Sequence, residues 1–132
     1  MRAGLIAPCG MNCRLCIAYS RARNPCPGCR GAGTCKPKTR AFCRIKTCEK
    51  MVKGRFAYCF SCDTFPCAGL LHLDERYRKK YGMSMIENLG LIRASGIRLF
   101  LRREQEKWAC PRCGDFLCVH TPRCLSCEYN WR

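Results

Sequence analysis

The chain has few of the residues from which an ordinary hydrophobic core is built. Leu, Ile, Val and Phe together make up 25 of its 132 residues, and only two of these are valines. Because β-branched residues are enriched in strands, so few valines argue against a large sheet. A low apolar content combined with a high net charge is typical of disordered chains, unless something other than apolar burial holds the chain together.

Long hydrophobic segments are also missing. No stretch approaches the roughly 18 consecutive apolar residues of a membrane-spanning helix. The opening residues, M-R-A-G-L-I-A-P-C-G, lack the apolar region of a secretory signal peptide. We therefore expect a cytoplasmic protein with no membrane partner, whose thiols stay reduced.

Acidic residues are scarce, with nine Asp and Glu against 25 Lys and Arg, for a formal net charge of +16. Residues 1–60 carry thirteen of the basic residues and a single acid, Glu49. The densest stretch, 36–55, holds Lys36, Lys38, Arg40, Arg44, Lys46, Lys50, Lys53 and Arg55. Nearby aromatic residues are suited to stacking on bases: Phe42, Phe56, Tyr58 and Phe60. This basic half predicts a surface for RNA or a ribonucleoprotein.

Cysteine is the abundant residue, with sixteen in the chain. Ten of them form five C-x-x-C pairs: Cys13/Cys16, Cys26/Cys29, Cys59/Cys62, Cys110/Cys113 and Cys124/Cys127. This spacing lets two sulfurs on one tight turn reach the same tetrahedral metal ion. In a reducing compartment metal binding is favoured over disulfides. Each structural zinc site can contribute about 10–16 kcal/mol of apparent folding free energy, enough to replace a missing core.

Residues 109–132 are predicted to form a compact, zinc-ribbon-like knot. Two C-x-x-C pairs separated by ten residues give a four-thiolate pattern, Cys110, Cys113, Cys124 and Cys127. Such a closed site is structural, because it leaves no coordination position for a substrate. Cys118 and His120 are surplus donors in the connecting loop. Either one of them replaces a paired cysteine, or they are a buried thiol and a partly exposed imidazole.

Residues 1–67 hold eleven cysteines among Pro and Gly, which predicts metal-binding knuckles and loops. Proximity along the chain suggests three groups: Cys26, Cys29, Cys35 and Cys43; then Cys48, Cys59, Cys62 and Cys67; then Cys9, Cys13 and Cys16. His72 would be a twelfth donor. The whole chain is then expected to bind about three to four zinc ions.

The group Cys9, Cys13 and Cys16 has an alternative interpretation. Its C-x-x-x-C-x-x-C spacing is the one by which radical enzymes that use S-adenosylmethionine hold a four-iron cluster with one open iron. So short a chain with two valines cannot build the large barrel of such an enzyme. An iron–sulfur cluster for electron transfer or sulfur handling, or a structural zinc site, are the remaining interpretations.

Residues 68–108 contain no cysteine and are predicted to form three helices. The first runs from about residue 68 to 81 and ends at Gly82. Ser84 and Glu87 form a capping box for the second, which ends at Gly96, and the third extends to Trp108.

Several runs together carry a family resemblance. They are P-C-G-M-N-C-R-L-C at 8–16, C-P-G-C at 26–29, F-C-R-I-K-T-C at 42–48, C-F-S-C-D-T-F-P-C at 59–67, I-E-N-L-G-L-I-R-A-S-G-I at 86–97 and Q-E-K-W-A-C-P-R-C-G at 105–114. The chain resembles the small archaeal and bacterial Cys-rich proteins of the domain of unknown function 3795 family. The resemblance implies a cytoplasmic metal-binding protein and brings no reaction or catalytic residues with it.

The sequence thus predicts a small, α-dominated, metal-stapled protein. Residues 1–67, 68–108 and 109–132 are its multi-knuckle, helical and zinc-ribbon-like regions, within one cooperative domain. Each zinc with four thiolates carries two negative charges, so some Lys and Arg are expected to neutralise thiolates instead of contacting a partner. The leading hypothesis is a zinc-binding, non-enzymatic module for RNA or a ribonucleoprotein. The alternatives are an iron–sulfur protein using Cys9, Cys13 and Cys16, and an adaptor for a protein partner.

Overall fold

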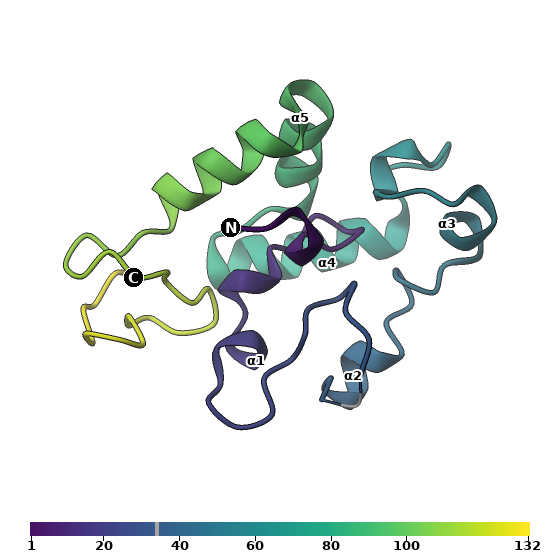
Figure 1. Cartoon of the computed structure of the whole chain (residues 1–132). Coiled ribbons are helices and arrows are strands. Elements are labelled where there is room, and N and C mark those ends of the chain that lie inside the picture. Colours follow the sequence, from purple (N-terminus) through teal and green to yellow (C-terminus); the bar gives the residue numbers. More distant parts are fainter. Residues whose placement is uncertain (34) are drawn as a thin grey trace.

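Two helices packed on each other form the centre of the protein in the computed structural model, which describes residues 1–33 and 35–132. Helix α4 spans Ala68–Tyr81 and helix α5 spans Met85–Lys107 (Figure 1). Leu70 of α4 and Leu89 of α5 are completely buried where the central packing forms. The helix predicted for residues 68–81 is confirmed, including the left-handed Gly82 that ends it.

The start of α5 is fixed by a buried carboxylate as well as by its cap. The Ser84 hydroxyl accepts a hydrogen bond from the Glu87 backbone at 3.0 Å, as the sequence predicts, and donates one of 2.7 Å to Asp74 Oδ1. The Ile86 backbone also donates to Asp74, at 3.0 Å. Asp74, which lies on α4, therefore ties the two long helices together.

Helix α5 bends at Gly96, whose φ of 78° and ψ of 162° are not helical. Residues with a side chain rarely adopt this conformation, so a glycine is needed there. The bend divides α5 into two arms, 85–95 and 97–107, which Figure 1 shows at an angle to each other. These arms correspond to the second and third predicted helices.

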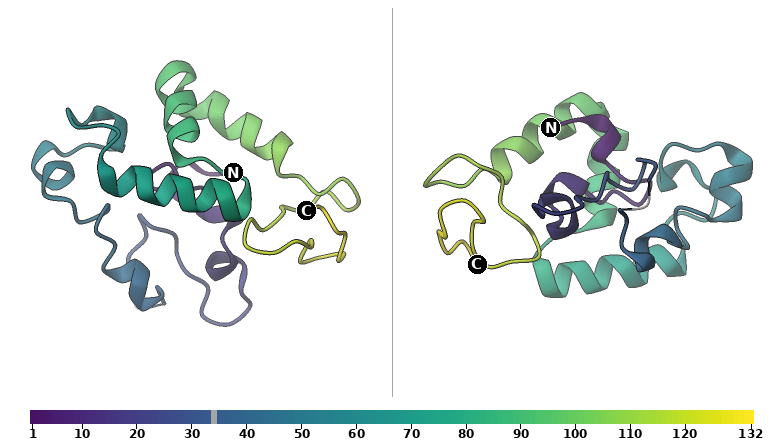
Figure 2. Two further views of the ribbon diagram at one scale, coloured as in Figure 1. Left: turned by 180° about the vertical axis from the view of Figure 1, so that it is seen from behind. Right: turned by 60° about the horizontal axis from the view of Figure 1, so that its bottom comes forward.

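The N-terminal segment packs against α5 and leads into the cysteine-rich loops. Ala7, Met11 and Leu15 are buried, and the Asn88 side chain of α5 donates a 2.9 Å hydrogen bond to the Gly10 carbonyl. Three short helices follow along the cysteine-rich loops (Figure 2): α1 at Ile17–Ser20, α2 at Lys38–Ala41 and α3 at Glu49–Gly54. Single 3₁₀ turns occur at Ala3–Leu5, Cys13–Leu15 and Cys59–Ser61.

The C-terminal segment 109–132 is held as loops without a helix. The Val119 backbone donates a 2.9 Å hydrogen bond to the Leu15 carbonyl, so this segment lies beside the N-terminal one. Trp108 and Trp131 pack edge to face across it. In the described part of the chain only isolated β-bridges occur and no sheet forms, so the fold is helix-dominated. None of the described helices has the length and apolar character needed to cross a membrane.

Candidate metal centre

Four cysteine sulfurs converge in the C-terminal segment. The Sγ atoms of Cys110, Cys113, Cys124 and Cys127 all lie within 4.8 Å of one another. Cys110 and Cys127 are 3.6 Å apart, and Cys113 and Cys124 are 3.7 Å apart. A tetrahedral ion with metal–sulfur bonds of about 2.3 Å places its ligands about 3.8 Å apart. The four thiols can therefore hold a metal ion with little movement.

Two turns of the same design present these sulfurs. In the first, the Cys110 backbone donates to Asp115 at 2.7 Å and the Gly114 backbone donates to Cys110 at 2.8 Å. Fourteen residues later Cys124 donates to Tyr129 at 2.9 Å and Glu128 donates to Cys124 at 3.0 Å. Gly114 and Glu128 hold the matching left-handed position, with φ of 77° and 58°. The sequence does not reveal this internal repeat, because the second turn has Glu where the first has Gly.

The four sulfurs differ in how readily they lose a proton, and Cys110 is the one that favours the thiolate. Burial acts to raise the pKa of Cys110, but backbone N–H groups of Cys113 and Arg112 and the neighbouring thiols of Cys127 and Cys113 lower it to about 7. Thiolates are the form that binds a metal ion. The backbone N–H of Asp115 lowers the pKa of Cys113, but the hydrogen bond with the Cys127 thiol and burial raise it to about 12. The backbone N–H of Tyr129 likewise opposes burial at Cys127, whose pKa is still raised. A cation bound by all four sulfurs would therefore displace protons from them.

Cys118 and His120 do not join this cluster. Cys118 is 1% exposed and packs in the interior. His120 uses both ring nitrogens in hydrogen bonds, because Nδ1 lies 3.3 Å from the Ile17 backbone N–H and Nε2 lies 3.1 Å from the Tyr77 hydroxyl. The sequence left two alternatives for this pair. The structure has a buried thiol at Cys118 and a half-buried imidazole at His120.

A second set of cysteines lines a small cavity of about 60 Å³ beneath α4 and the N-terminal segment. Its cysteines are Cys9, Cys13, Cys16, Cys26, Cys29 and Cys43. We call it the six-thiol cavity. The trio Cys9, Cys13 and Cys16 is therefore not isolated, because three further sulfurs face the same space. The Cys29 backbone N–H donates to Cys13 Sγ at 3.3 Å, which joins the first two C-x-x-C pairs.

Basic side chains turn toward the six-thiol cavity. The Cys13 thiol donates to Cys29, and this bond, with the positive charges of Arg40, Lys36 and Lys46, lowers the pKa of Cys29 to about 6 against the opposing effect of burial. The same bond raises the pKa of Cys13. Burial raises the pKa of Cys9 to about 12. Some basic residues of the stretch 36–55 thus lie beside thiols. We expected this from the negative charge that metal-bound thiolates carry.

A third set lines a cavity of about 160 Å³ between α3 and the start of α4. Its cysteines are Cys48, Cys59, Cys62 and Cys67, the four that proximity along the chain placed together. Burial, together with the charges of the other three thiols, raises the pKa of the Cys59 thiol to about 12. We call this space the four-thiol cavity.

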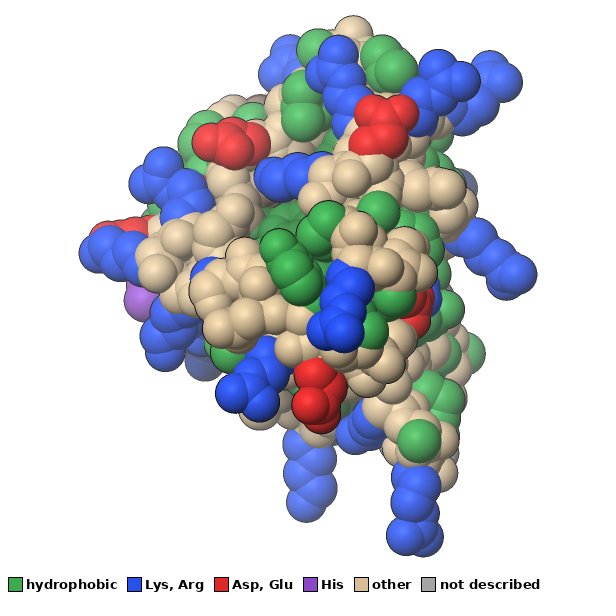
Figure 3. Space-filling model, turned by 90° about the vertical axis from the view of Figure 1, so that its left-hand side faces the viewer, with side chains coloured by type: hydrophobic (Ala, Val, Ile, Leu, Met, Phe, Trp, Pro, Cys, Tyr) green, Lys and Arg blue, Asp and Glu red, His purple; other side chains and the backbone are tan. Residues whose placement is uncertain are grey.

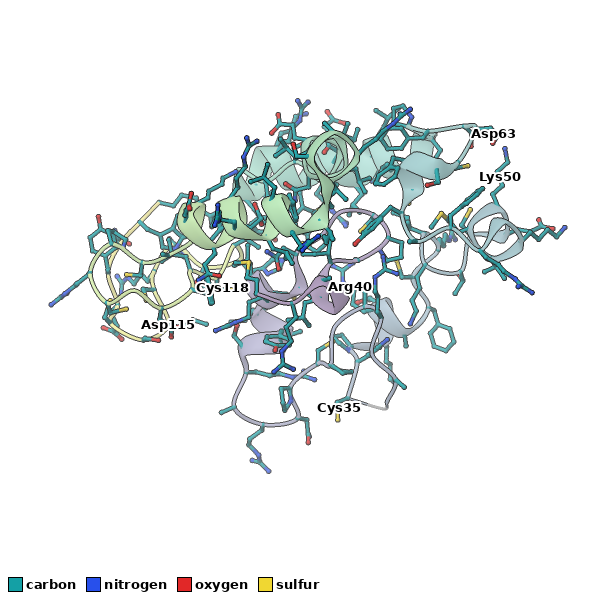
Figure 4. All side chains as sticks on the ribbon, turned by 45° about the horizontal axis from the view of Figure 1, so that its top comes forward. Cys35, Arg40, Lys50, Asp63, Asp115 and Cys118 are labelled. Carbon is teal, nitrogen blue, oxygen red and sulfur yellow. The ribbon has the colours of Figure 1, made fainter. Side chains whose placement is uncertain are left out.

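Two candidate ligands lie apart from these cavities. Cys35 is a neighbour of Arg21 and Lys38 at the edge of the molecule and points away from Arg40 (Figure 4). The structure therefore differs from the sequence grouping, which placed Cys35 with Cys26, Cys29 and Cys43. His72 is exposed on α4 and lines neither cavity in the described part of the chain.

The remaining basic residues of the stretch 36–55 differ in their partners. Lys50 pairs with Asp63 at 2.9 Å, and Lys53 pairs with Glu49 at 2.5 Å. Figure 4 labels Lys50 and Asp63 next to each other. Three others are exposed and in no ion pair among the described residues: Lys38, Arg44 and Arg55. Figure 3 faces the side of the C-terminal segment, away from α3, and there too Lys and Arg side chains project around the rim with only scattered acids among them.

Comparison with known proteins gives one family. The family model described as a protein of unknown function (DUF3795) matches residues 5–72, just over half of the chain. The match contains all eleven cysteines from Cys9 to Cys67 and ends before the four-sulfur cluster. Neither the curated proteins nor the solved structures give a match. Since the model covers more than half of its length, the chain belongs to the DUF3795 family.

Proposed function

We propose that the protein is a zinc-binding, non-enzymatic module whose C-terminal segment is held by one closed zinc site at Cys110, Cys113, Cys124 and Cys127. The observation that carries this proposal is the pair of sulfur–sulfur distances, 3.6 and 3.7 Å, close to the edge of a zinc–thiolate tetrahedron. A four-iron cluster would hold its thiolates further apart, because each binds a different iron. The geometry thus favours a single ion.

A structural role follows from the number of ligands. Four protein thiolates fill the coordination sphere of zinc and leave no position for a substrate or a reactive water. The segment 109–132 has no helix, and its buried apolar side chains include only Leu117 and Val119 besides cysteines. Zinc would therefore supply the folding free energy that this segment does not obtain from a core.

Metal analysis of anaerobically purified protein tests this function. The double variant Cys113→Ser/Cys127→Ser should contain one zinc per chain fewer than the wild type, because a site with two thiolates binds zinc far more weakly. Cys118→Ala, which removes a thiol outside the cluster, should keep the wild-type zinc content. An unchanged zinc content in the double variant would refute the zinc site. Iron in the wild type in place of zinc, with strong visible absorption, would also refute it.

RNA binding is a second candidate function, favoured by one exposed aromatic residue. Phe42 is 82% exposed and directly follows α2. Lys38 and Arg44 on either side of it are exposed and free of carboxylate partners among the described residues. An unburied ring between unpaired cations suits a single-stranded nucleic acid, whose base stacks while its phosphates pair.

Salt-dependent binding of single-stranded RNA tests this second function. Because Lys50 and Lys53 are already paired, the informative variant is Lys38→Gln/Arg44→Gln/Arg55→Gln. It should weaken binding and reduce the slope of log affinity against log salt by about 2. The matched control on α5, Arg93→Gln/Arg98→Gln/Arg103→Gln, removes the same charge elsewhere. Equal losses in both variants would show only attraction to net charge and would sink this idea.

A further inference from the structure

A second, wider pocket adjoins the six-thiol cavity and differs from it in chemistry. It has a volume of about 360 Å³ and lies between α1, α2, α4 and the loop that carries His120. Its polar lining consists of Thr39, Arg40, Arg76, Tyr77, Lys80 and His120 beside the half-buried Cys16. None of the described residues that line it is an Asp or a Glu. We call it the basic pocket.

The cations of α4 divide according to the side on which they lie. Arg78 pairs with Asp74 at 3.3 Å and Lys79 pairs with Glu75 at 2.6 Å, so both are neutralised within their own helix. Arg76 and Lys80, one turn apart, line the basic pocket and form no ion pair among the described residues. If the basic face of α4 were merely solvated, nothing would require its two unpaired cations to lie on the side of the pocket.

The buried tyrosine in the wall has a hydroxyl proton to donate. The Ile17 backbone N–H donates to His120 Nδ1, so the neutral imidazole carries its proton on Nε2. Nε2 then donates to the Tyr77 hydroxyl at 3.1 Å, and Arg40 donates to the same oxygen at 3.5 Å. These two donors occupy both lone pairs of the Tyr77 hydroxyl oxygen. The hydroxyl proton itself has no acceptor in either of these hydrogen bonds. Tyr77 is only 4% exposed, so solvent water has little access to accept this proton.

Burial keeps His120 in the neutral form that this arrangement needs. It lowers the pKa of the imidazole, and the nearby positive charges of Arg40 and Arg132 lower it further. An anion in the pocket would accept a hydrogen bond from the Tyr77 hydroxyl. It would also form ion pairs with the three cations of the lining, Arg40, Arg76 and Lys80.

We propose that the basic pocket binds the phosphate group of a small phosphorylated molecule. Two guanidinium groups and one ammonium supply charge and directed donors for the terminal oxygens of a phosphate. Thr39 and Tyr77 add two hydroxyl donors. The volume is in the range of small-ligand pockets and exceeds what one phosphate fills, so room remains for an organic group. Ile17, Pro37 and Tyr81 also line the pocket and offer apolar surface to such a group.

Calorimetric titration of the zinc-loaded full chain with phenyl phosphate tests the proposal. The double variant Arg76→Gln/Lys80→Gln should weaken binding by about tenfold or more. The matched control Arg78→Gln/Lys79→Gln removes the same two charges from the same helix and should change the affinity by less than about threefold. Equal losses in the two variants, or no binding by the wild type at about 10 mM, would overturn the proposal.

Two further comparisons separate a phosphate site from general attraction to anions. Tyr77→Phe keeps the ring and removes the donor, so it should weaken phenyl phosphate binding by about tenfold while the helical circular dichroism stays unchanged. Benzoate, which has the same ring and one charge fewer, should bind at least about tenfold more weakly. Benzoate binding as tight as phenyl phosphate, or a Tyr77→Phe affinity equal to the wild type, would contradict a phosphate site.

Discussion

The side-chain amide of Asn12 donates a hydrogen bond of 2.9 Å to the carboxylate of Glu104, and both residues are buried. The indole of Trp108 donates to the other carboxylate oxygen at 3.2 Å. Glu104 lies in the second arm of α5, and Trp108 directly follows that helix. One carboxylate therefore connects the N-terminal cysteine turn, the long helix and the entry to the four-sulfur cluster.

Removing that carboxylate should destabilise the protein. Glu104→Ala leaves two buried donors without an acceptor, which we expect to lower the free energy of unfolding by about 2–4 kcal/mol. Urea denaturation of the zinc-loaded protein measures the change. Glu106→Ala, on the exposed side of the same arm, should cost no more than about 0.5 kcal/mol. Similar values for the two variants would mean that Glu104 does not hold these segments together.

Gly10 should not tolerate a side chain. Its φ is +88°, and a Cβ built there would lie 2.6 Å from the Met85 carbonyl oxygen and 2.9 Å from Leu89 Cγ. Gly10→Ala should therefore lower the free energy of unfolding by about 2–4 kcal/mol.

Gly90 provides the matched control for that substitution. It is exposed within α5, and apart from its chain neighbours and the backbone of its own helix no atom lies within 4 Å of the position of its Cβ. Gly90→Ala should stabilise the protein by about 0.5–1 kcal/mol through helix propensity. Thermal unfolding followed by circular dichroism should move the two midpoints in opposite directions. A Gly10→Ala midpoint at or above that of the wild type would contradict the close packing of this loop on α5.

Tyr77 should titrate at a higher pH than a free tyrosine. Burial raises its pKa from 10.0 to about 12, and the nearby Arg40 opposes this only in part. In an alkaline titration followed by phenolate absorbance, the wild type should show a late step near pH 12, and Tyr77→Phe should remove that step. If the step persists in the variant, the delayed tyrosine is another one.

The same shift gives stability a definite dependence on pH. The folded protein holds the Tyr77 proton more tightly than the unfolded chain, so this contribution is complete below about pH 10 and is lost as the pH rises toward 12. Between about pH 9 and pH 11 the wild type should lose about 1 kcal/mol more stability than Tyr77→Phe. A greater loss in the variant would have the wrong sign.

Features decided by neighbouring residues could be predicted from the sequence. The cap at Ser84, the stop at Gly82 and the bend at Gly96 depend on contacts within one or two helical turns. The four sulfurs at 110–127 come from two pairs on adjacent turns, so their convergence needs only a short loop.

Features decided by the path of long loops could not be predicted. No periodic pattern encodes how residues 17–48 fold back. Proximity along the chain placed both Cys35 and Cys43 with Cys26 and Cys29. In the structure Cys43 joins Cys26 and Cys29 in the six-thiol cavity, which also holds Cys9, Cys13 and Cys16, and Cys35 does not. The bond between Asn12 and Glu104 joins residues 92 positions apart. The contact between Tyr77 and His120 likewise joins α4 to a loop that has no secondary structure.

Cobalt substitution tests the central claim, one tetrahedral four-thiolate ion at Cys110, Cys113, Cys124 and Cys127, most directly. Metal-free wild type and Cys113→Ser/Cys127→Ser are each titrated with cobalt(II) under anaerobic conditions, and their visible spectra are subtracted. We predict a difference spectrum with the intense ligand-field bands of tetrahedral cobalt and with thiolate-to-cobalt charge transfer, equivalent to one ion per chain. A difference spectrum of weak, octahedral intensity, or no difference between the two proteins, would contradict the account.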